Sequence, residues 1–319
     1  MKQGYRPIRA GGVVTPSLGL NRVAACTLDA GELQAVFLPS AGMLCASLRH
    51  RGVELLRRVE DLDGAAEEAR TAGIALLHPW ANRLSGLRYR AAGHEVTLDP
   101  NSRLVHLDGR GLPMHGVPWS RLTWEVTEVA RERVAARLDW TGGELLTVFP
   151  YPHRLDLVAT LRSDGLTLET TLVAGRESPV PVSFGFHPYF GLPGQARADW
   201  RLALPAMRRL ALDARGIPTG RDDPFAGLDA PLNTLDFDDA FAVLDGRMSM
   251  SIRGADRRIS VVFLDGFSHA QVFAPREKDF IALEPMTAPT DALTSGRGLR
   301  LVPPGGTFTA AFNIHIEDL

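Results

Sequence analysis

The feature that most restricts the fold of this chain is a strict alternation of apolar and polar residues along short segments. The alternation runs through residues 122–126, 134–140, 155–161 and 166–172. A period of two is that of a β-strand with one buried face, and it is typical of antiparallel sheets. Helical signal is weak, because the best stretch of helix-forming residues, 65–72, is short. The pattern therefore predicts an all-β protein.

Turn residues between these segments indicate how the strands connect. Ser-Asp-Gly at 163–165 separates two alternating runs, and Gly-Ala-Asp at 254–256 separates the runs 248–252 and 259–263. Both patterns are typical of β-hairpins. A further run, 308–316, alternates over five apolar positions, and 31 glycines and 22 prolines are spread along the chain. Frequent turns between short strands favour a β-sandwich or a barrel.

The 319 residues contain no Pro/Gly-rich linker, no block of like charge and no convincing repeat. We therefore expect a single domain over residues 1–319, with 221–232 as a long surface loop. The formal net charge of −2 offers no broad basic field for nucleic acid or anionic lipid. The first residues lack the apolar core of a signal peptide, and no run approaches the roughly 18 apolar residues of a membrane span. By default, the expected location is the cytoplasm.

The two cysteines, Cys26 and Cys45, do not form a CxxC pair. A metal knuckle or a dithiol redox motif is therefore not expected. Both lie among apolar residues, so we expect buried free thiols.

Five segments combine polar or ionisable residues with large apolar ones next to turn residues, which is the context of many functional sites. These segments are 78–84, 114–117, 184–190, 235–241 and 282–286.

His187 and Glu284 are the most distinctive residues in these segments. His187 lies among aromatic residues, where its pKa responds to small changes and can suit proton transfer. The same context fits a core histidine bonded to a backbone carbonyl, and residue context alone slightly favours that interpretation. Glu284 follows the apolar run 280–283, which predicts a buried strand that ends at Pro285. Its context leaves a structural and a functional role equally open.

The remaining polar residues are individually ambiguous. Asp238 and Asp239 would point to opposite faces of a strand, so at most one is expected to face a given site. Asn82-Arg83 and His115 are, taken alone, more often structural or surface features than ligands, and His78 has the same ambiguity.

Taken together, the segments resemble the aldose 1-epimerase family, also called galactose mutarotases. Five motifs of that family occur here in the family's order, over a chain of the right length, and the similarity extends from about residue 30 to the end. They are Ala81-Asn82-Arg83-Leu84, His115-Gly116, His187-Pro188-Tyr189-Phe190, Asp238-Asp239-Ala240-Phe241 and Leu283-Glu284.

The resemblance implies a large two-sheet antiparallel sandwich, the galactose mutarotase-like supersandwich, with a sugar in a cleft on one sheet. It implies that His187 is the general acid that protonates the ring oxygen, and that Glu284 is the general base that deprotonates the anomeric hydroxyl. The implied contacts to the sugar are Asn82, Arg83, His115, Asp238 and Gln271. Trp80, Phe186 and Tyr189 are expected to form an apolar wall for one sugar face.

These residue types suit the interconversion of α and β anomers of an aldose. Opening a hemiacetal ring needs one proton delivered to the ring oxygen and one removed from the hydroxyl on C1. No redox step is involved, so we expect no metal or nucleotide cofactor, and the sequence has no P-loop, dinucleotide fingerprint or metal-ligand cluster. A sugar is the expected small-molecule partner, without nucleic acid or membrane, and the chain is expected to be a monomer or homodimer.

Two departures from the family pattern bear on the identity of the sugar. His78-Pro79-Trp80 replaces a Gly-Arg pair that often precedes the Asn-Arg motif, and Pro188 takes the place of a serine or threonine. Three alternatives stay open: a hexose-6-phosphate 1-epimerase that binds phosphate through Arg83 or Arg88, a sugar-binding protein without turnover, and a glycosidase. The glycosidase would use Asp238 and Glu284 as its two carboxylates, but it would leave the histidine motif without a role.

Overall fold

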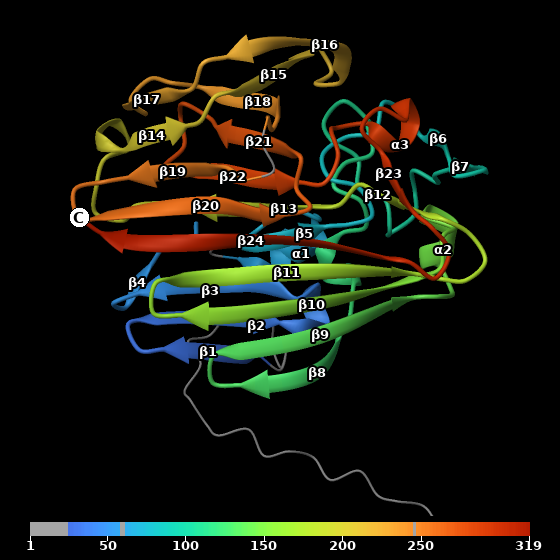
Figure 1. Cartoon of the computed structure of the whole chain (residues 1–319), viewed down its shortest axis with the longest axis horizontal. Coiled ribbons are helices and arrows are strands. Elements are labelled where there is room, and N and C mark those ends of the chain that lie inside the picture. Colours follow the sequence, from blue (N-terminus) through green and yellow to red (C-terminus); the bar gives the residue numbers. More distant parts are fainter. Residues whose placement is uncertain (1–24, 58–60, 245–246) are drawn as a thin grey trace, which may run out of the picture.

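Two large antiparallel sheets form the protein, and they lie one behind the other in Figure 1. The computed structural model describes residues 25–57, 61–244 and 247–319. The 11-stranded sheet has, in spatial order, β1 (Cys26–Ala30), β2 (Leu33–Leu38), β3 (Leu44–His50), β5 (Ile74–Leu77), β13 (Gly185–Phe190), β22 (Ile281–Met286), β21 (His269–Ala274), β18 (Phe237–Ala242), β15 (Met207–Leu212) and β16 (Pro218–Phe225), with β4 (Val53–Glu54) paired to β3.

The second sheet has nine strands and covers the inner face of the first. In spatial order they are β17 (Leu228–Pro231), β14 (Arg201–Leu204), β19 (Ser249–Arg253), β20 (Arg257–Asp265), β24 (Thr307–Asp318), β11 (Gly165–Ala174), β10 (His153–Arg162), β9 (Arg133–Trp140) and β8 (Glu125–Ala130). Two short pairs complete the strands: β6 (Arg88–Ala91) with β7 (His94–Thr97), and β12 (Val180–Val182) with β23 (Arg300–Val302).

Helices are short and lie in the connections between strands. They are α1 (Leu62–Glu67), α2 (Leu145–Val148), α3 (Ala292–Ser295) and the 3₁₀ turns Pro39–Ala41, Trp119–Arg121 and Arg197–Asp199. None of the helices in the described ranges is long and apolar enough to cross a membrane.

The prediction of an all-β, antiparallel sandwich is confirmed. Alternate residues of β10 are buried along its length, so one face of this strand packs into the space between the sheets. Both predicted hairpins are present, as β10–β11 and β19–β20. The run 308–316 lies within β24. In 122–126 only the last two residues belong to a strand, because Leu122 caps the 3₁₀ turn Trp119–Arg121 and β8 begins only at Glu125.

Three other expectations are wrong or only partly right. The expected surface loop at 221–232 contains most of β16 and all of β17. Pro285 does not end its strand, because β22 continues to Met286 with Pro285 opposite Ala270 of β21. Cys45 is a buried free thiol as expected, but Cys26 is only half-buried.

The core between the sheets contains an unusual pair of histidines. Nε2 of His78 lies 2.9 Å from Nε2 of His153, the rings of His153 and Trp140 stack at 5.4 Å, and both histidines are buried. Burial lowers the pKa of His153 to about 4 and holds that of His78 well below its usual range. Both imidazoles are therefore neutral in the folded protein near neutral pH.

This pair predicts acid sensitivity. A histidine that binds protons near pH 6.5 when unfolded, but only near pH 4 when folded, contributes stability above pH 6.5 that is lost as the pH falls toward 4. His153 alone is expected to account for roughly 2 kcal/mol of the free energy of unfolding lost by pH 5. Urea denaturation of wild type and His153→Gln at pH 7.5 and 5 measures this contribution.

The His153→Gln variant is expected to lose less stability between the two pH values than wild type. The exposed-histidine control His315→Gln is expected to match wild type in this respect. An equal loss in His153→Gln and wild type would contradict the assignment.

Candidate active site

The middle of the 11-stranded sheet carries a row of polar side chains on its outer face. The register of β13 against β22 puts His187 level with Glu284, and that of β21 against β22 pairs Gln271 with Glu284. On the next strand, β18, Asp238 lies diagonally across from Gln271. Four adjacent strands thus each contribute one polar side chain to the same face.

These side chains are close enough to act on one small molecule. Nε2 of His187 is 3.3 Å from Oε1 of Glu284, and the two side chains are 5% and 2% exposed. Nε2 of Gln271 donates a hydrogen bond of 2.7 Å to Oδ1 of Asp238. The ring of His115 meets that of His187 edge-on, with centroids 5.4 Å apart.

Two loops beyond the sheet complete the cluster. The backbone N–H of His115 donates to the carbonyl of Asn82 at 2.8 Å, which ties the loops together. Both residues have left-handed backbones, with φ of 63° and 55°, a conformation that costs free energy and often occurs at functional sites. Nε of Arg83 donates to Oδ2 of Asp108 at 2.7 Å, and Nη1 donates to Oδ1 of Asn82 at 3.2 Å. The guanidinium is thus held in one orientation.

Gly116 sets the position of the His115 loop. A side-chain Cβ at Gly116 would lie 2.3 Å from the carbonyl oxygen of His78, and the residue has φ of +68°. Only glycine allows this close approach. His78 therefore supports the loop through its backbone, which also accepts a hydrogen bond from Val117, while its ring lies in the core.

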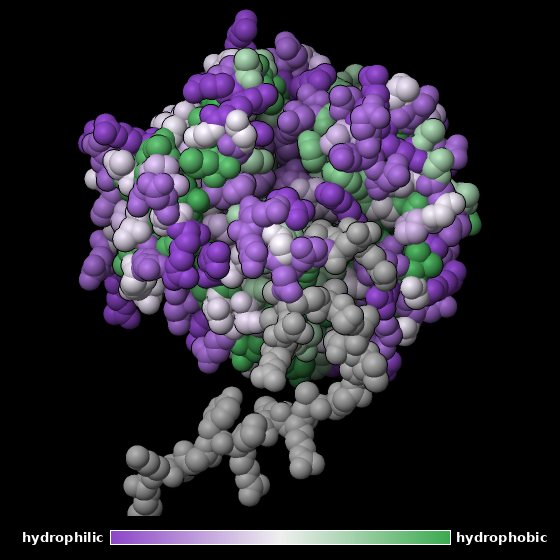
Figure 2. Space-filling model, turned by 180° about the vertical axis from the view of Figure 1, so that it is seen from behind, coloured by the Kyte–Doolittle hydropathy of each residue, from purple (hydrophilic) through white to green (hydrophobic). Residues whose placement is uncertain are grey.

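All seven predicted site residues line one cavity of about 300 Å³. The outer face of the 11-stranded sheet is the face seen in Figure 2, where the surface is hollowed. The lining residues are Arg57, Ala69, Arg70, Thr71, Asn82, Arg83, His106, Met114, His115, His187, Tyr189, Asp238, Gln271, Phe273 and Glu284. The volume is at the lower end of the range for small-molecule sites.

Burial controls the protonation of the central groups. It lowers the pKa of His187 to about 3 and lowers that of His115 well below its usual range, where neighbouring His187 and Arg83 act in the same direction. It raises the pKa of Glu284 well above its usual range, with a further rise from Asp238 that Arg83 opposes. Burial therefore favours a neutral imidazole and a protonated carboxyl in the pair His187–Glu284.

Several buried polar atoms of the cluster have no hydrogen-bond partner among the described residues. Oε2 of Glu284, Oε1 of Gln271 and Nδ1 of His115 are three of them, and Nδ1 of His187 is a fourth. Buried polar groups are normally hydrogen-bonded, and exceptions call for an explanation. A bound molecule rich in hydroxyl groups would offer partners to atoms of this kind.

One wall of the cavity is aromatic. The ring of Tyr189 stacks on that of His187 at 4.1 Å, and its hydroxyl lies 2.6 Å from Oγ1 of Thr71. The guanidinium of Arg57 lies 4.3 Å from the centroid of Phe280, next to Tyr189. This wall fixes the plane of the His187 ring.

Some expected site residues lie elsewhere. Trp80 and Phe186 are buried in the core between the sheets and do not line the cavity, so only Tyr189 of the expected apolar wall reaches it. Arg88 lies exposed on β6 and does not line it either. Asp239, unlike Asp238, forms an ion pair with Arg209 outside the cavity.

The sequence analysis missed four polar or charged lining residues. These are Arg57, Arg70, Thr71 and His106. None stands in a distinctive local pattern, and residue 57 comes from a strand-connecting segment with no functional signal. The partner of Arg83, Asp108, was also missed, although an Asp-Gly pair at a turn is a position where a fixed carboxylate is common.

No group of three or more His, Cys, Asp or Glu side chains within the described ranges is arranged to hold a metal ion.

Comparison with known proteins identifies the family. Residues 25–315 match the family model described as aldose 1-epimerase. The chain belongs to the aldose 1-epimerase family. It is 25% identical, over 301 residues, to the Escherichia coli K12 protein YihR, described as uncharacterized, and the match covers 91% of this chain and 92% of that one. Membership of this family indicates an enzyme of the sugar epimerase type.

Solved structures of the family share the fold. A galactose mutarotase-like protein from Clostridium acetobutylicum superimposes with a TM-score of 0.80 at 17% identity, covering 92% of this chain and 95% of that one. A galactose 1-epimerase from Lactobacillus acidophilus superimposes with a TM-score of 0.74 at 16% identity, covering 96% and 98%. The galactose mutarotase-like supersandwich predicted from the motifs is thus the fold of this chain.

Proposed function

We propose that this protein is an aldose 1-epimerase that interconverts the α and β anomers of an aldose. The observation that supports this most is the pair His187–Glu284, with 3.3 Å between Nε2 and Oε1 at one cavity. The ring oxygen and the anomeric hydroxyl are bonded to the same carbon of the sugar. An acid and a base must therefore stand side by side to reach both, as these two groups do.

Ring opening starts from the ionic form of the pair, in which the shared proton lies on His187, whereas burial favours the neutral form, in which it lies on Glu284. His187 as an imidazolium delivers a proton to the ring oxygen, and Glu284 as a carboxylate takes the proton of the C1 hydroxyl. The bond between C1 and the ring oxygen breaks. The products are the open-chain aldehyde, a neutral imidazole and a protonated carboxyl. Rotation about the C1–C2 bond and the reverse transfers close the ring on its other face.

Burial favours the state of the pair that accompanies the open-chain sugar. The lowered pKa of His187 favours the loss of its proton, and the raised pKa of Glu284 favours the gain of one. Both transfers occur in ring opening. The pair carries one proton in total before and after the two transfers together, so ring opening leaves the net charge of the buried pair unchanged.

Asn82, Arg83, His115, Asp238 and Gln271 are proposed to bind the sugar hydroxyls. The fixed guanidinium of Arg83 and the hydrogen-bonded pair of Gln271 and Asp238 present both donors and acceptors. The unpartnered atoms of Gln271 and His115 gain partners when hydroxyls occupy the cavity.

Polarimetry tests the function directly. Freshly dissolved α-glucose and α-galactose are expected to reach anomeric equilibrium faster with the protein than in buffer alone, at a rate proportional to protein concentration. Glucose 6-phosphate belongs in the same experiment, because Arg57 and Arg70 line the cavity and would favour an anionic sugar. If none of the sugars equilibrates faster than in buffer, the proposal is wrong, and tight sugar binding without turnover would then establish a binding protein.

A further inference from the structure

The outer face of the nine-stranded sheet carries a polar cavity of about 370 Å³. It lies over β17, β14, β19 and β20, which are neighbouring strands at one end of the sheet (Figure 1). Leu202, Met250 and Ile252 alternate with the lining residues and are buried in the core, so the lining residues point outward. The lining residues are Arg201, Ala203, Asp229, Ser249, Ser251, Arg253, Arg258 and Ser260, and none of them lines the cavity at His187 and Glu284.

Three arginines stand opposite one another across this face. The strand register pairs Arg201 of β14 with Arg253 of β19, and Arg253 with Arg258 of β20. Like charges directly opposite each other on adjacent strands destabilise a sheet. The outer two have partners, because Arg201 forms an ion pair with Asp229 and Arg258 forms one with Glu317. The half-buried Arg253 between them forms no ion pair with any described residue, so its charge is left without a partner.

The next row of side chains forms the floor of the cavity. Ala203 of β14 lies opposite Ser251 of β19, which lies opposite Ser260 of β20. These small side chains leave space beside the row of arginines, and Ser260 is only 7% exposed. Serine hydroxyls donate hydrogen bonds as guanidinium groups do. The cavity therefore presents mainly hydrogen-bond donors around an unpaired positive charge.

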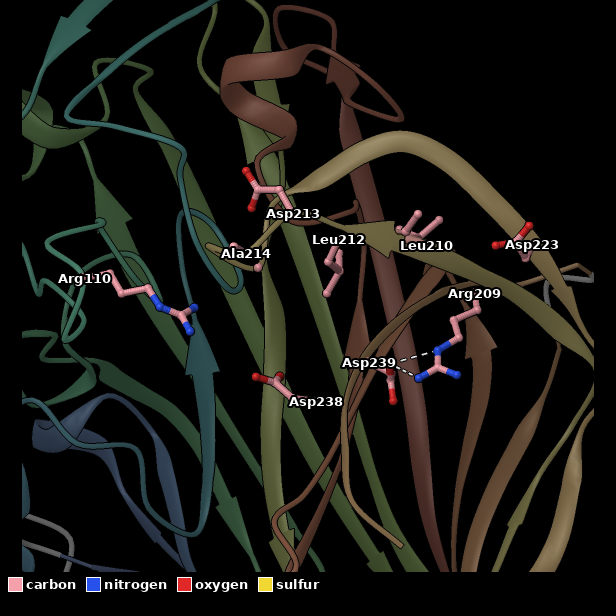
Figure 3. Close-up of a pocket in the computed structure, with 11 residues that line it drawn as sticks. Arg110, Arg209, Leu210, Leu212, Asp213, Ala214, Asp223, Asp238 and Asp239 are labelled. Atoms are coloured by element: carbon pink, nitrogen blue, oxygen red, sulfur yellow. Dashed lines mark hydrogen bonds and ion pairs between the residues drawn. The ribbon is translucent and has the colours of Figure 1, made fainter.

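Charge distinguishes this cavity from the one between the Arg110 loop, β15 and β18, which is drawn in Figure 3. Four aspartates and two arginines line the cavity in Figure 3, and one of the arginines, Arg209, is ion-paired to Asp239. The cavity on the nine-stranded sheet has the opposite balance, with three arginines and a single aspartate. An anion is therefore repelled by the first and attracted by the second.

From this geometry we propose that the cavity over β14, β19 and β20 binds a small tetrahedral oxyanion, a phosphate or sulfate group, with Arg253 as its central cation. The forked guanidinium donates to two oxygens of such a group, and the hydroxyls of Ser251 and Ser260 are donors for the others. The bound anion also offsets the repulsion among the three arginines. A free ion and a phosphate monoester of a small metabolite offer the same chemistry to these side chains.

Titration calorimetry with inorganic phosphate tests the site. Sodium chloride keeps the ionic strength constant, so that general screening is the same in every sample. Phosphate is expected to bind the wild type, and Arg253→Gln is expected to weaken the affinity about tenfold or more. Ser251→Asp is an independent second variant, which puts a carboxylate next to the guanidinium groups and is expected to remove binding. Sulfate and glycerol 3-phosphate, titrated in the same way, show whether the free ion or the monoester binds more tightly.

Urea denaturation gives a second measurement. Without phosphate, Arg253→Gln is expected to be at least as stable as the wild type, because it removes the central like charge. Phosphate is expected to raise the free energy of unfolding of the wild type and to change that of Arg253→Gln much less. Arg209→Gln is the matched control, because it also removes one arginine, from the cavity in Figure 3. It is expected to keep the wild-type affinity for phosphate.

The outcomes that would overturn the site are distinct. One is the absence of phosphate binding to the wild type at constant ionic strength, and another is an unchanged affinity in both Arg253→Gln and Ser251→Asp. A third is loss of binding in Arg70→Gln but not in Arg253→Gln, which would put the ion in the cavity at His187 and Glu284. The mutarotase proposal depends on none of these results, because polarimetry tests it separately.

Discussion

Replacing Glu284 by glutamine is expected to lower kcat for anomeric interconversion by about 10²–10⁴-fold, the usual contribution of one general acid–base group. The amide has nearly the same shape as the carboxyl, but it cannot take the proton of the C1 hydroxyl. The remaining rate is that of a bound sugar with an acid and no base. The initial change in optical rotation of α-glucose or α-galactose, measured at saturating sugar, gives kcat for both proteins.

Stability distinguishes a catalytic from a structural role for Glu284. Its side chain is 2% exposed and its pKa is raised by burial, so a neutral amide is not expected to lower the free energy of unfolding. The expected result is a folded protein of unchanged or higher stability that has lost its activity. The control Glu125→Gln changes an exposed carboxyl on β8 and is expected to keep the wild-type rate. A wild-type kcat in Glu284→Gln would remove Glu284 from the mechanism.

Alternation predicted those strands that bury one face against the core. It succeeded for β9, β10, β11, β19, β20 and β24, where a buried position recurs at every second residue over most of the strand. It failed for β16 and β17, the outermost strands of their sheets, because most of their residues are exposed or half-buried. The sequences of these two strands therefore contain no alternation of apolar and polar residues to detect.

The two His-Pro-aromatic segments show why local sequence cannot place a site. His78 and His187 have similar neighbours, but Ala75 of β5 pairs with His187 of β13 and shares its outer face. His78 lies three residues after Ala75, an odd spacing that points its side chain to the inner face, where it meets His153. Register between strands distant in sequence decides this, and no single segment contains that information.

The five motifs contain six of the predicted site residues, the resemblance implied Gln271 as a seventh, and the structure brings all seven to one cavity. The resemblance could not find Arg57 or His106, each a single lining residue from a connection, or the neighbours Arg70 and Thr71, because none of these connections has a pattern of its own. Nor could it show that Arg83 is held by Asp108, since that contact depends on how two loops fold over the sheet. Sequence thus predicted seven residues that line the cavity, and tertiary packing decides which other residues surround them.

Replacing His187 by asparagine is expected to lower kcat by about 10²–10⁴-fold, because the amide keeps hydrogen bonding but cannot deliver a proton to the ring oxygen. The control His315→Asn changes an exposed histidine on β24 and is expected to keep the wild-type rate. The ring of His187 also stacks on Tyr189, so circular dichroism and sugar affinity must show that the variant stays folded and binds.

The double variant His187→Asn/Glu284→Gln discriminates between a catalytic pair and two independent contributors. If the two groups transfer protons in the same step, loss of either disables the step, and the double variant is expected to be little slower than the slower single variant. Rate losses that multiply would mean that the groups act independently. That result would contradict the arrangement of Nε2 and Oε1, 3.3 Å apart, as one acid–base pair.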